Sequence, residues 1–175
     1  MAATIRELRW ADLDDLIDIY LHLYEERGTS GSIGITLYHE PPTRAAEVAW
    51  FADLYRRNLE GPVVIRVAEV DGHAVGSCTV SPSGAGTNSE MSHVGILGIL
   101  IHHAHRGQGV GRALMTDVLE RCRGTYEIVR LSVFSNNSKA IRLYEQLGFE
   151  RCGHIPRAIR RGNTYFDTDE MILAL

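Results

Sequence analysis

Residues 94–112 read VGILGILIHHAHRGQGVGR, and this stretch decides the fold. Its first part, Val94 to Ile101, is almost continuously apolar, which predicts a strand covered on both faces of a sheet. Gly95 and Gly98 interrupt that strand where glycine weakens pairing, so we expect a bulge or the close approach of a ligand. The residues after Gly109 have helical periodicity. A buried strand therefore runs into a helix through a glycine-rich loop.

The loop itself, Arg106 to Gly111, is a candidate phosphate-binding turn. Unpaired backbone N–H groups at the positive end of a helix bind phosphate anions. Two common phosphate motifs fail here, because G-x-G-x-x-G would need a glycine in place of Arg112 and a P-loop would need a Gly-Lys-Ser/Thr triplet. The spacing that remains is R-x-x-G-x-G. The alternative, a plain tight turn, gives no reason for an arginine beside three glycines.

Toward the N-terminus, residues 63–70 and 74–80 flank Asp71-Gly72 and predict an antiparallel hairpin. Thr4 to Leu8 predict a first strand, and helical spacing from Leu13 to Tyr24 predicts a first helix. We expect a second helix after Pro41-Pro42, with Thr43 as its N-cap and with one side formed by Ala46, Ala49, Trp50, Asp53 and Leu54. Between the helices, Gly28 to Glu40 read as a long loop and as a candidate lid on the acceptor side.

Toward the C-terminus, residues 109–122 predict a helix and residues 127–134 a strand. Asn137 can cap a further helix that ends at Leu147-Gly148-Phe149, and two strands follow, from about Phe149 and from Tyr165 to Leu173. The order β-α-α-β-β-β-α-β-α-β-β predicts an α/β fold, a mixed sheet of about seven strands flanked by about four helices. We expect one domain over residues 1–175, because 175 residues with 45% hydrophobic side chains can bury one core.

Composition excludes several classes of protein. Eighteen Lys+Arg against twenty-two Asp+Glu give a net charge of -4, which argues against a nucleic-acid partner. No apolar run approaches the roughly 20 residues of a membrane span, so we expect neither a membrane partner nor export. The three cysteines have no CxxC spacing, which indicates neither a disulfide framework nor a zinc site. We therefore expect a cytoplasmic protein.

The pattern R-x-x-G-x-G, followed by LSVFSNNSKAIRLYEQLGF (131–149), resembles the GNAT family of acetyl-CoA-dependent N-acetyltransferases. The resemblance covers residues 92–149 and is weaker elsewhere. It implies that the strand before the loop splays away from the next parallel strand and that the pantetheine of acetyl-CoA enters the gap, with Gly98 placed for a bulge. His103 stands where the family often has proline. The coenzyme-binding groups that the resemblance implies are the backbones of Ile99 and Ile101 for pantetheine, and those of Arg106, Gly107, Gln108, Gly109, Val110, Gly111 and Arg112 for the pyrophosphate.

The resemblance also implies catalytic roles. Tyr144 matches the tyrosine that protonates the coenzyme thiolate, although it also fits a core aromatic residue. Asn137 fits a helix cap, a contact to the coenzyme arm, or both. For the general base, Glu90 and His93 are candidates acting through water, against the alternatives of a solvated carboxylate and a surface imidazole. The expected acceptor is a primary amine (a small amine, an amino acid or a protein N-terminus) that attacks directly in a ternary complex.

Three further groups of residues invite other chemistry. We reject a metal site at His102, His103 and His105, because adjacent strand residues point to opposite faces and the family needs no metal. Cys122 lies on the apolar stripe of its helix and is expected in the core, not as a nucleophile. The acidic residues of the last strand could face an amine, but Asp167 and Asp169 share one side and Glu170 takes the other, which we interpret as exposed strand polarity.

Two rival functions stay open at this point. One is a non-catalytic module that senses acyl-CoA, and the other is a nucleotide-binding module. The expected partners are acetyl-CoA and the amine acceptor, and a homodimer is left open.

Overall fold

The computed structural model describes residues 3–29, 38–84 and 89–175, and in that part of the chain the strands form a seven-stranded sheet. The order is β1-β2-β3-β4-β5-β7-β6, antiparallel except for the parallel pair β4–β5. The strands are β1 (Thr4–Glu7), β2 (Val64–Val70), β3 (His73–Pro82), β4 (Val94–Ile101), β5 (Ile128–Phe134), β6 (Glu150–Arg161) and β7 (Thr164–Ala174). The helices are α1 (Leu13–Thr29), α2 (Arg44–Glu60), α3 (Val110–Cys122) and α4 (Ser138–Gln146). This order confirms the predicted one.

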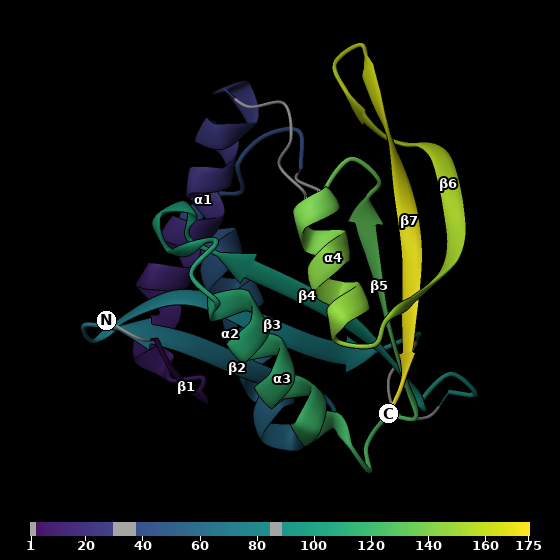
Figure 1. Cartoon of the computed structure of the whole chain (residues 1–175). Helices are drawn as coiled ribbons and strands as arrows, with labels where there is room; N and C mark the ends of the chain where they lie inside the picture. Colours follow the sequence, from purple (N-terminus) through teal and green to yellow (C-terminus); the bar gives the residue numbers. More distant parts are fainter. Residues whose placement is uncertain (1–2, 30–37, 85–88) are drawn as a thin grey trace.

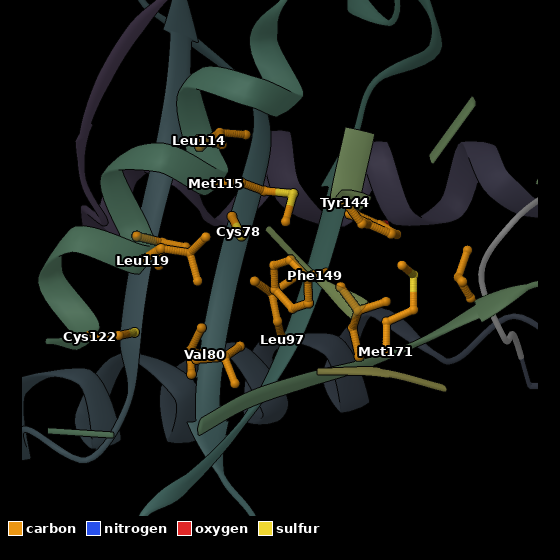
Figure 2. Close-up of a cluster of buried hydrophobic side chains, with 14 of the residues drawn as sticks. Cys78, Val80, Leu97, Leu114, Met115, Leu119, Cys122, Tyr144, Phe149 and Met171 are labelled. Atoms are coloured by element: carbon orange, nitrogen blue, oxygen red, sulfur yellow. The ribbon is translucent and has the colours of Figure 1, made fainter. Parts of the chain in front are cut away.

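Helices α3 and α4 lie on one face of the sheet, and α1 and α2 lie on the other (Figure 1). A large apolar cluster fills the space beneath α3 and α4, with Cys78, Leu97, Met115, Tyr144 and Phe149 among its members (Figure 2). A second cluster, which includes Leu16, Phe51 and Ile65, lies beneath α1 and α2. The N-terminal half of the sheet is therefore packed on both faces.

Strand β4 differs from its prediction in two ways. Gly95 and Leu97 are buried, but Ile96 and Gly98 are exposed, because on the face of α1 and α2 the helices reach β4 only near Leu100. The predicted cover on both faces is therefore wrong at Ile96 and Gly98, in the middle of the strand. The register with β3 runs without a shift from Gly95 to Ile101, so there is no bulge at Gly98.

Helix α2 begins where the sequence predicts, but it is rotated from the predicted orientation. The Thr43 hydroxyl accepts a hydrogen bond from the Ala46 N–H at 3.2 Å, which confirms the N-cap. The buried residues of the helix are Glu47, Phe51 and Leu54, whereas Trp50 is 57% exposed. The helix face at positions i, i+4 and i+7 therefore packs against the core, because the large Phe51 side chain buries more apolar surface than the alanines of the predicted side.

The predicted long loop between α1 and α2 shortens at its N-terminal end, and its last residues, 38–40, are non-helical as predicted. Gly28 and Thr29 belong to α1, and residues 30–37 lie outside the described residues. In the described part of the chain, no helix combines the length and apolar character that crossing a bilayer requires.

Candidate functional site

A gap opens in the sheet where β4 and β5 separate (Figure 1). The two strands pair only from Val94 to Ile96, opposite Ile128 to Arg130. Beyond that point β4 continues to pair with β3 as far as Ile101, while β5 continues to pair with β7 as far as Phe134. Within residues 3–29, 38–84 and 89–175 no strand fills the gap, so each strand presents an unpaired backbone edge to it. The predicted splay of the parallel strands is therefore present.

Hydrogen bonds to β3 determine which residues of β4 face the gap. The Val94 carbonyl accepts from the Ser83 N–H at 2.8 Å, and the His102 N–H donates to the Val75 carbonyl at 2.9 Å. In an antiparallel ladder such residues alternate, so the even-numbered residues of β4 bond to β3. The N–H and C=O groups of Leu97, Ile99 and Ile101 consequently point into the gap. Two of these are the residues predicted to bind pantetheine.

A loop with two left-handed glycines follows β4 and begins α3. Gly107 has φ of 74° and Gly109 has φ of 86°, and a Cβ added at either would meet no protein atom within 4 Å. The first helical hydrogen bond runs from the Ala113 N–H to the Gly109 carbonyl at 3.1 Å. The three preceding N–H groups, at residues 110–112, have no acceptor within the helix and sit at its positive end. This geometry suits a phosphate anion.

The side chain of Arg106 is committed to contacts within the protein. Its guanidinium donates two hydrogen bonds to Glu26 of α1, at 2.8 and 3.1 Å, and a third to the Ile101 carbonyl at 2.8 Å. The arginine therefore ties the end of β4 and the glycine loop to α1. Its contribution to the loop is positional, and this partner was not foreseen because Glu26 lies 80 residues away in sequence.

Two further side chains brace the loop. The Gln108 amide donates to the Ala104 carbonyl at 2.7 Å, and Arg112 donates to the side-chain oxygen of Gln146 on α4. Gly111 packs closely instead, since an added Cβ would lie 3.2 Å from Ile101 and 3.3 Å from Leu143. These contacts fix the start of α3 against both β4 and α4.

Helix α4 carries the predicted acid and cap. The Asn137 Oδ1 accepts a hydrogen bond from the Ala140 N–H at 3.2 Å, which confirms the cap. Tyr144 is 8% exposed and packs against Phe149 with ring centroids 6.0 Å apart (Figure 2). Burial raises the pKa of Tyr144 to about 12. Its hydroxyl therefore stays protonated at neutral pH, as a proton donor must.

The structure places Glu90 and His93 before the start of the gap and far from the glycine loop. Both lie in the turn before β4, at the end where β4 and β5 are paired. The His93 carbonyl accepts from the N–H groups of Glu127 and Ile128 at 2.9 and 3.2 Å, which holds this turn against the start of β5. The glycine loop lies beyond the opposite end of the eight-residue strand. At about 3.3 Å per residue, the two candidates are more than ~20 Å of strand away from that loop.

The histidines after β4 are clustered, contrary to the reasoning from strand alternation. They lie on the short 3₁₀ helix η2 (His103–His105) and its N-cap, so adjacent rings come together. The His102 ring centroid lies 4.3 Å from that of His103 and 5.5 Å from that of His22 on α1. Burial lowers the pKa of His102, and the neighbouring imidazoles and Arg106 lower it further. Among the described residues, no group of three or more potential ligands has the geometry to hold a metal ion.

Asp169 corrects the interpretation of the last strand. It is 1% exposed and binds His154 Nδ1 at 2.8 Å and Arg151 at 3.3 Å, so it is a buried structural carboxylate and not exposed polarity. Asp167 lies on the same side, 3.5 Å from His154, as predicted.

Cys122 is fully buried, and burial raises the pKa of its thiol to about 12, which confirms the core position.

A pocket of about 430 Å³ lies on the other face of the sheet, between α1 and α2. Leu100 and Ser77 lie at its base, and Tyr20, Trp50 and the buried Glu47 line its sides. The sequence did not indicate it, because the residues come from five elements. A carboxylate among apolar residues of α2 was the one available signal.

Comparisons with known proteins identify the family to which this site belongs. Residues 13–149 match the model of the family described as Acetyltransferase (GNAT) family. The chain is 28% identical over 143 residues to glucosamine 6-phosphate N-acetyltransferase of Trypanosoma brucei brucei, covering 78% of this chain and 92% of that protein. It is 32% identical over 103 residues to the L-amino acid N-acetyltransferase AaaT of Escherichia coli (strain K12), covering 58% and 62%.

Among solved structures, a GNAT superfamily phosphinothricin acetyltransferase from Sinorhizobium meliloti, in complex with AcCoA, superposes with a TM-score of 0.83. The two chains are 23% identical, and the match covers 100% of this chain and 89% of that one. This structural similarity establishes the fold of the chain.

Proposed function

The chain belongs to the acetyltransferase (GNAT) family and is an acetyl-CoA-dependent N-acetyltransferase, and we propose that it transfers the acetyl group directly to a primary amine bound beside the sheet gap. One observation carries the proposal: the unpaired edge of β4 is followed, after the short helix η2, by the glycine loop at the positive end of α3. A long donor with an amide-rich arm and a pyrophosphate fits that succession of backbone groups.

The chain's own groups support binding of such a donor. In this proposal the backbone of Ile99 and the N–H of Ile101 bond the pantetheine arm as a further strand would, and the N–H groups from Gly107 to Arg112 hold the pyrophosphate. The Arg106 N–H, predicted to join them, instead donates to the His103 carbonyl at 3.3 Å. Gly98 and Gly109 leave open the space that a side chain would occupy beside the gap and the loop. The donor supplies an activated thioester.

Three catalytic tasks are then assigned to this chain. A backbone N–H of the gap near Ile101 stabilises the oxyanion that forms on attack. The Tyr144 hydroxyl donates a proton to the departing thiolate, which its raised pKa supports. Asn137 caps α4 and so positions Tyr144.

The proton on the amine is a separate problem. An alkylammonium with a pKa near 10 has no free lone pair, so the rate is expected to rise with pH. The two candidates for the base, Glu90 and His93, both lie before the paired part of β4 and β5, outside the gap. We therefore assign the base to neither.

Thiol release in the presence of acetyl-CoA and a panel of primary amines tests the proposal. We expect release that depends on the amine and is accompanied by one acetylated product per thiol. Acetyl-CoA binding without amine-dependent release would favour the acyl-CoA sensor, and tighter binding of ATP than of acetyl-CoA would favour the nucleotide module. The single domain of residues 1–175 and the cytoplasmic location stay predictions, and a homodimer stays open.

A further inference from the structure

The pocket between α1 and α2 combines aromatic walls with one negative charge. Tyr20, Tyr38 and Trp50 contribute rings to its lining. Among the described residues that line it, Glu47 is the only carboxylate, and none is a lysine, arginine or histidine. Aromatic faces and a carboxylate both attract an organic cation, and neither attracts an anion.

Glu47 is the unusual member of this lining. Glu47 is only 7% exposed, yet no hydrogen bond or ion pair joins its carboxylate to another residue of the described chain. Burial raises its pKa, as expected for a carboxyl group that is partly removed from water and has no cationic partner among the described residues. A buried carboxylate is costly unless a cation compensates it. The Glu47 carboxylate therefore lacks a positively charged partner, which a cationic ligand could supply.

The pocket also adjoins the sheet gap. Leu100 lies at the base of the pocket, and its neighbours on β4, Ile99 and Ile101, direct their backbone groups into the gap. Gly98 lies two residues earlier on the same face as Leu100, and a Cβ added there would meet no atom within 4 Å. A ligand in the pocket can consequently approach the gap over Gly98.

We propose that this pocket selects the acceptor: it binds an organic ammonium ion on a compact apolar body through Glu47 and the aromatic rings, and it discriminates against amines that carry a carboxylate or phosphate. The proposal rests on the acetyl-transfer function and deepens it. An acidic group on the acceptor would meet Glu47 with no cation in the described lining to offset the repulsion. Glu47 is thus a specificity-determining residue.

Calorimetry on the protein saturated with CoA, which cannot transfer an acetyl group, tests the pocket apart from the reaction. The probes are 2-phenylethylamine, the neutral 2-phenylethanol, and phenylalanine, which adds a carboxylate to the amine. We expect the amine to bind at least about tenfold more tightly than the alcohol or the amino acid. Glu47→Gln should bring amine and alcohol to about equal affinity.

A matched control separates the pocket from overall charge. Glu60→Gln removes a carboxylate from the same helix, at an exposed position beside Arg56, and should keep the preference for the amine. Glu47→Gln should melt at the same temperature or higher, since an unpartnered buried carboxylate is removed. A lower melting temperature, equal binding of amine and alcohol to the parent protein, or a preference that survives Glu47→Gln would overturn the inference.

The failure of this inference and that of the proposed function are distinguishable. Amine-dependent thiol release without selectivity for the cation would remove the role of Glu47 and leave acetyl transfer intact. A protein that binds the amine selectively but does not bind acetyl-CoA would refute the proposed function and would leave the cation site standing.

Discussion

Replacing Tyr144 with phenylalanine removes the hydroxyl proposed to protonate the thiolate and keeps the ring in the core. The pKa of Tyr144 is raised from 10.0 to about 12, so at pH 8 the hydroxyl is a proton donor in essentially every molecule. Positioned acids contribute roughly 10²- to 10⁴-fold to rate, and we expect a loss of about 10²-fold in kcat, or about 2.7 kcal/mol. The affinity for acetyl-CoA should be nearly unchanged, because the ring still packs on Phe149.

Single-turnover acetyl transfer at saturating substrates is the assay, with acetyl-CoA binding measured separately. Tyr126→Phe is the matched control, because Tyr126 is also buried but its hydroxyl donates to the Pro62 carbonyl, away from the gap. We expect that variant to lose stability by about 1 kcal/mol and to keep its rate. Full turnover in Tyr144→Phe, with chemistry limiting, would show that Tyr144 is only a core aromatic residue.

The same variant has a pH signature in stability. Because the pKa of Tyr144 is raised on folding, the contribution of its protonated form is fully present below pH 10 and is lost as the pH rises to about 12. Two pKa units correspond to about 3 kcal/mol. Above pH 10 the free energy of unfolding should therefore fall less steeply in Tyr144→Phe than in the parent protein, and equal slopes would contradict the burial of this hydroxyl.

Further outcomes concern residues around the site and in the C-terminal hairpin. Arg106→Ala should weaken acetyl-CoA binding by only about fivefold, about 1 kcal/mol, because its side chain holds Glu26 and positions the loop, as calorimetry can show. Glu90→Gln and His93→Ala should give pH–rate profiles parallel to that of the parent, and a selective loss at low pH would restore them as bases. Asp169→Asn should lower the free energy of unfolding by about 3 kcal/mol at pH 7. Burial alone would raise the pKa of Asp169, but His154, Ser135 and Arg151 lower it, so this difference should shrink in urea titrations as the pH falls below about 4.

Local signals in the sequence predicted the site's framework well. The caps at Thr43 and Asn137 are properties of a few adjacent residues, and the structure contains both. The same holds for Gly148, which has φ of 93° and ends α4 with the Phe149 N–H donating to the Tyr144 carbonyl at 3.0 Å. The order of strands followed from the change in hydrophobic period.

Contacts between distant segments were not predictable in this way. Arg106 finds its carboxylate 80 residues away on α1, and His22 joins the histidines after β4 from the same helix. Asp169 reads as exposed polarity until β6 brings His154 beside it. Glu47 lies on a blurred helical stripe, and only the packing of α2 reveals which side is buried. Each of these depends on the tertiary arrangement, which local periodicity does not encode.

The central claim is that the glycine loop at the start of α3 holds the pyrophosphate of acetyl-CoA, and a pair of glycine variants tests it most directly. Gly109 and Gly124 both have positive φ, 86° and 82°, and an added Cβ meets no protein atom at either, so valine strains the backbone about equally in both. They lie at opposite ends of α3, about 20 Å apart. Calorimetric titration with acetyl-CoA should show at least about 100-fold weaker binding for Gly109→Val, and an affinity near that of the parent for Gly124→Val. Equal affinities in the two folded variants would contradict the claim.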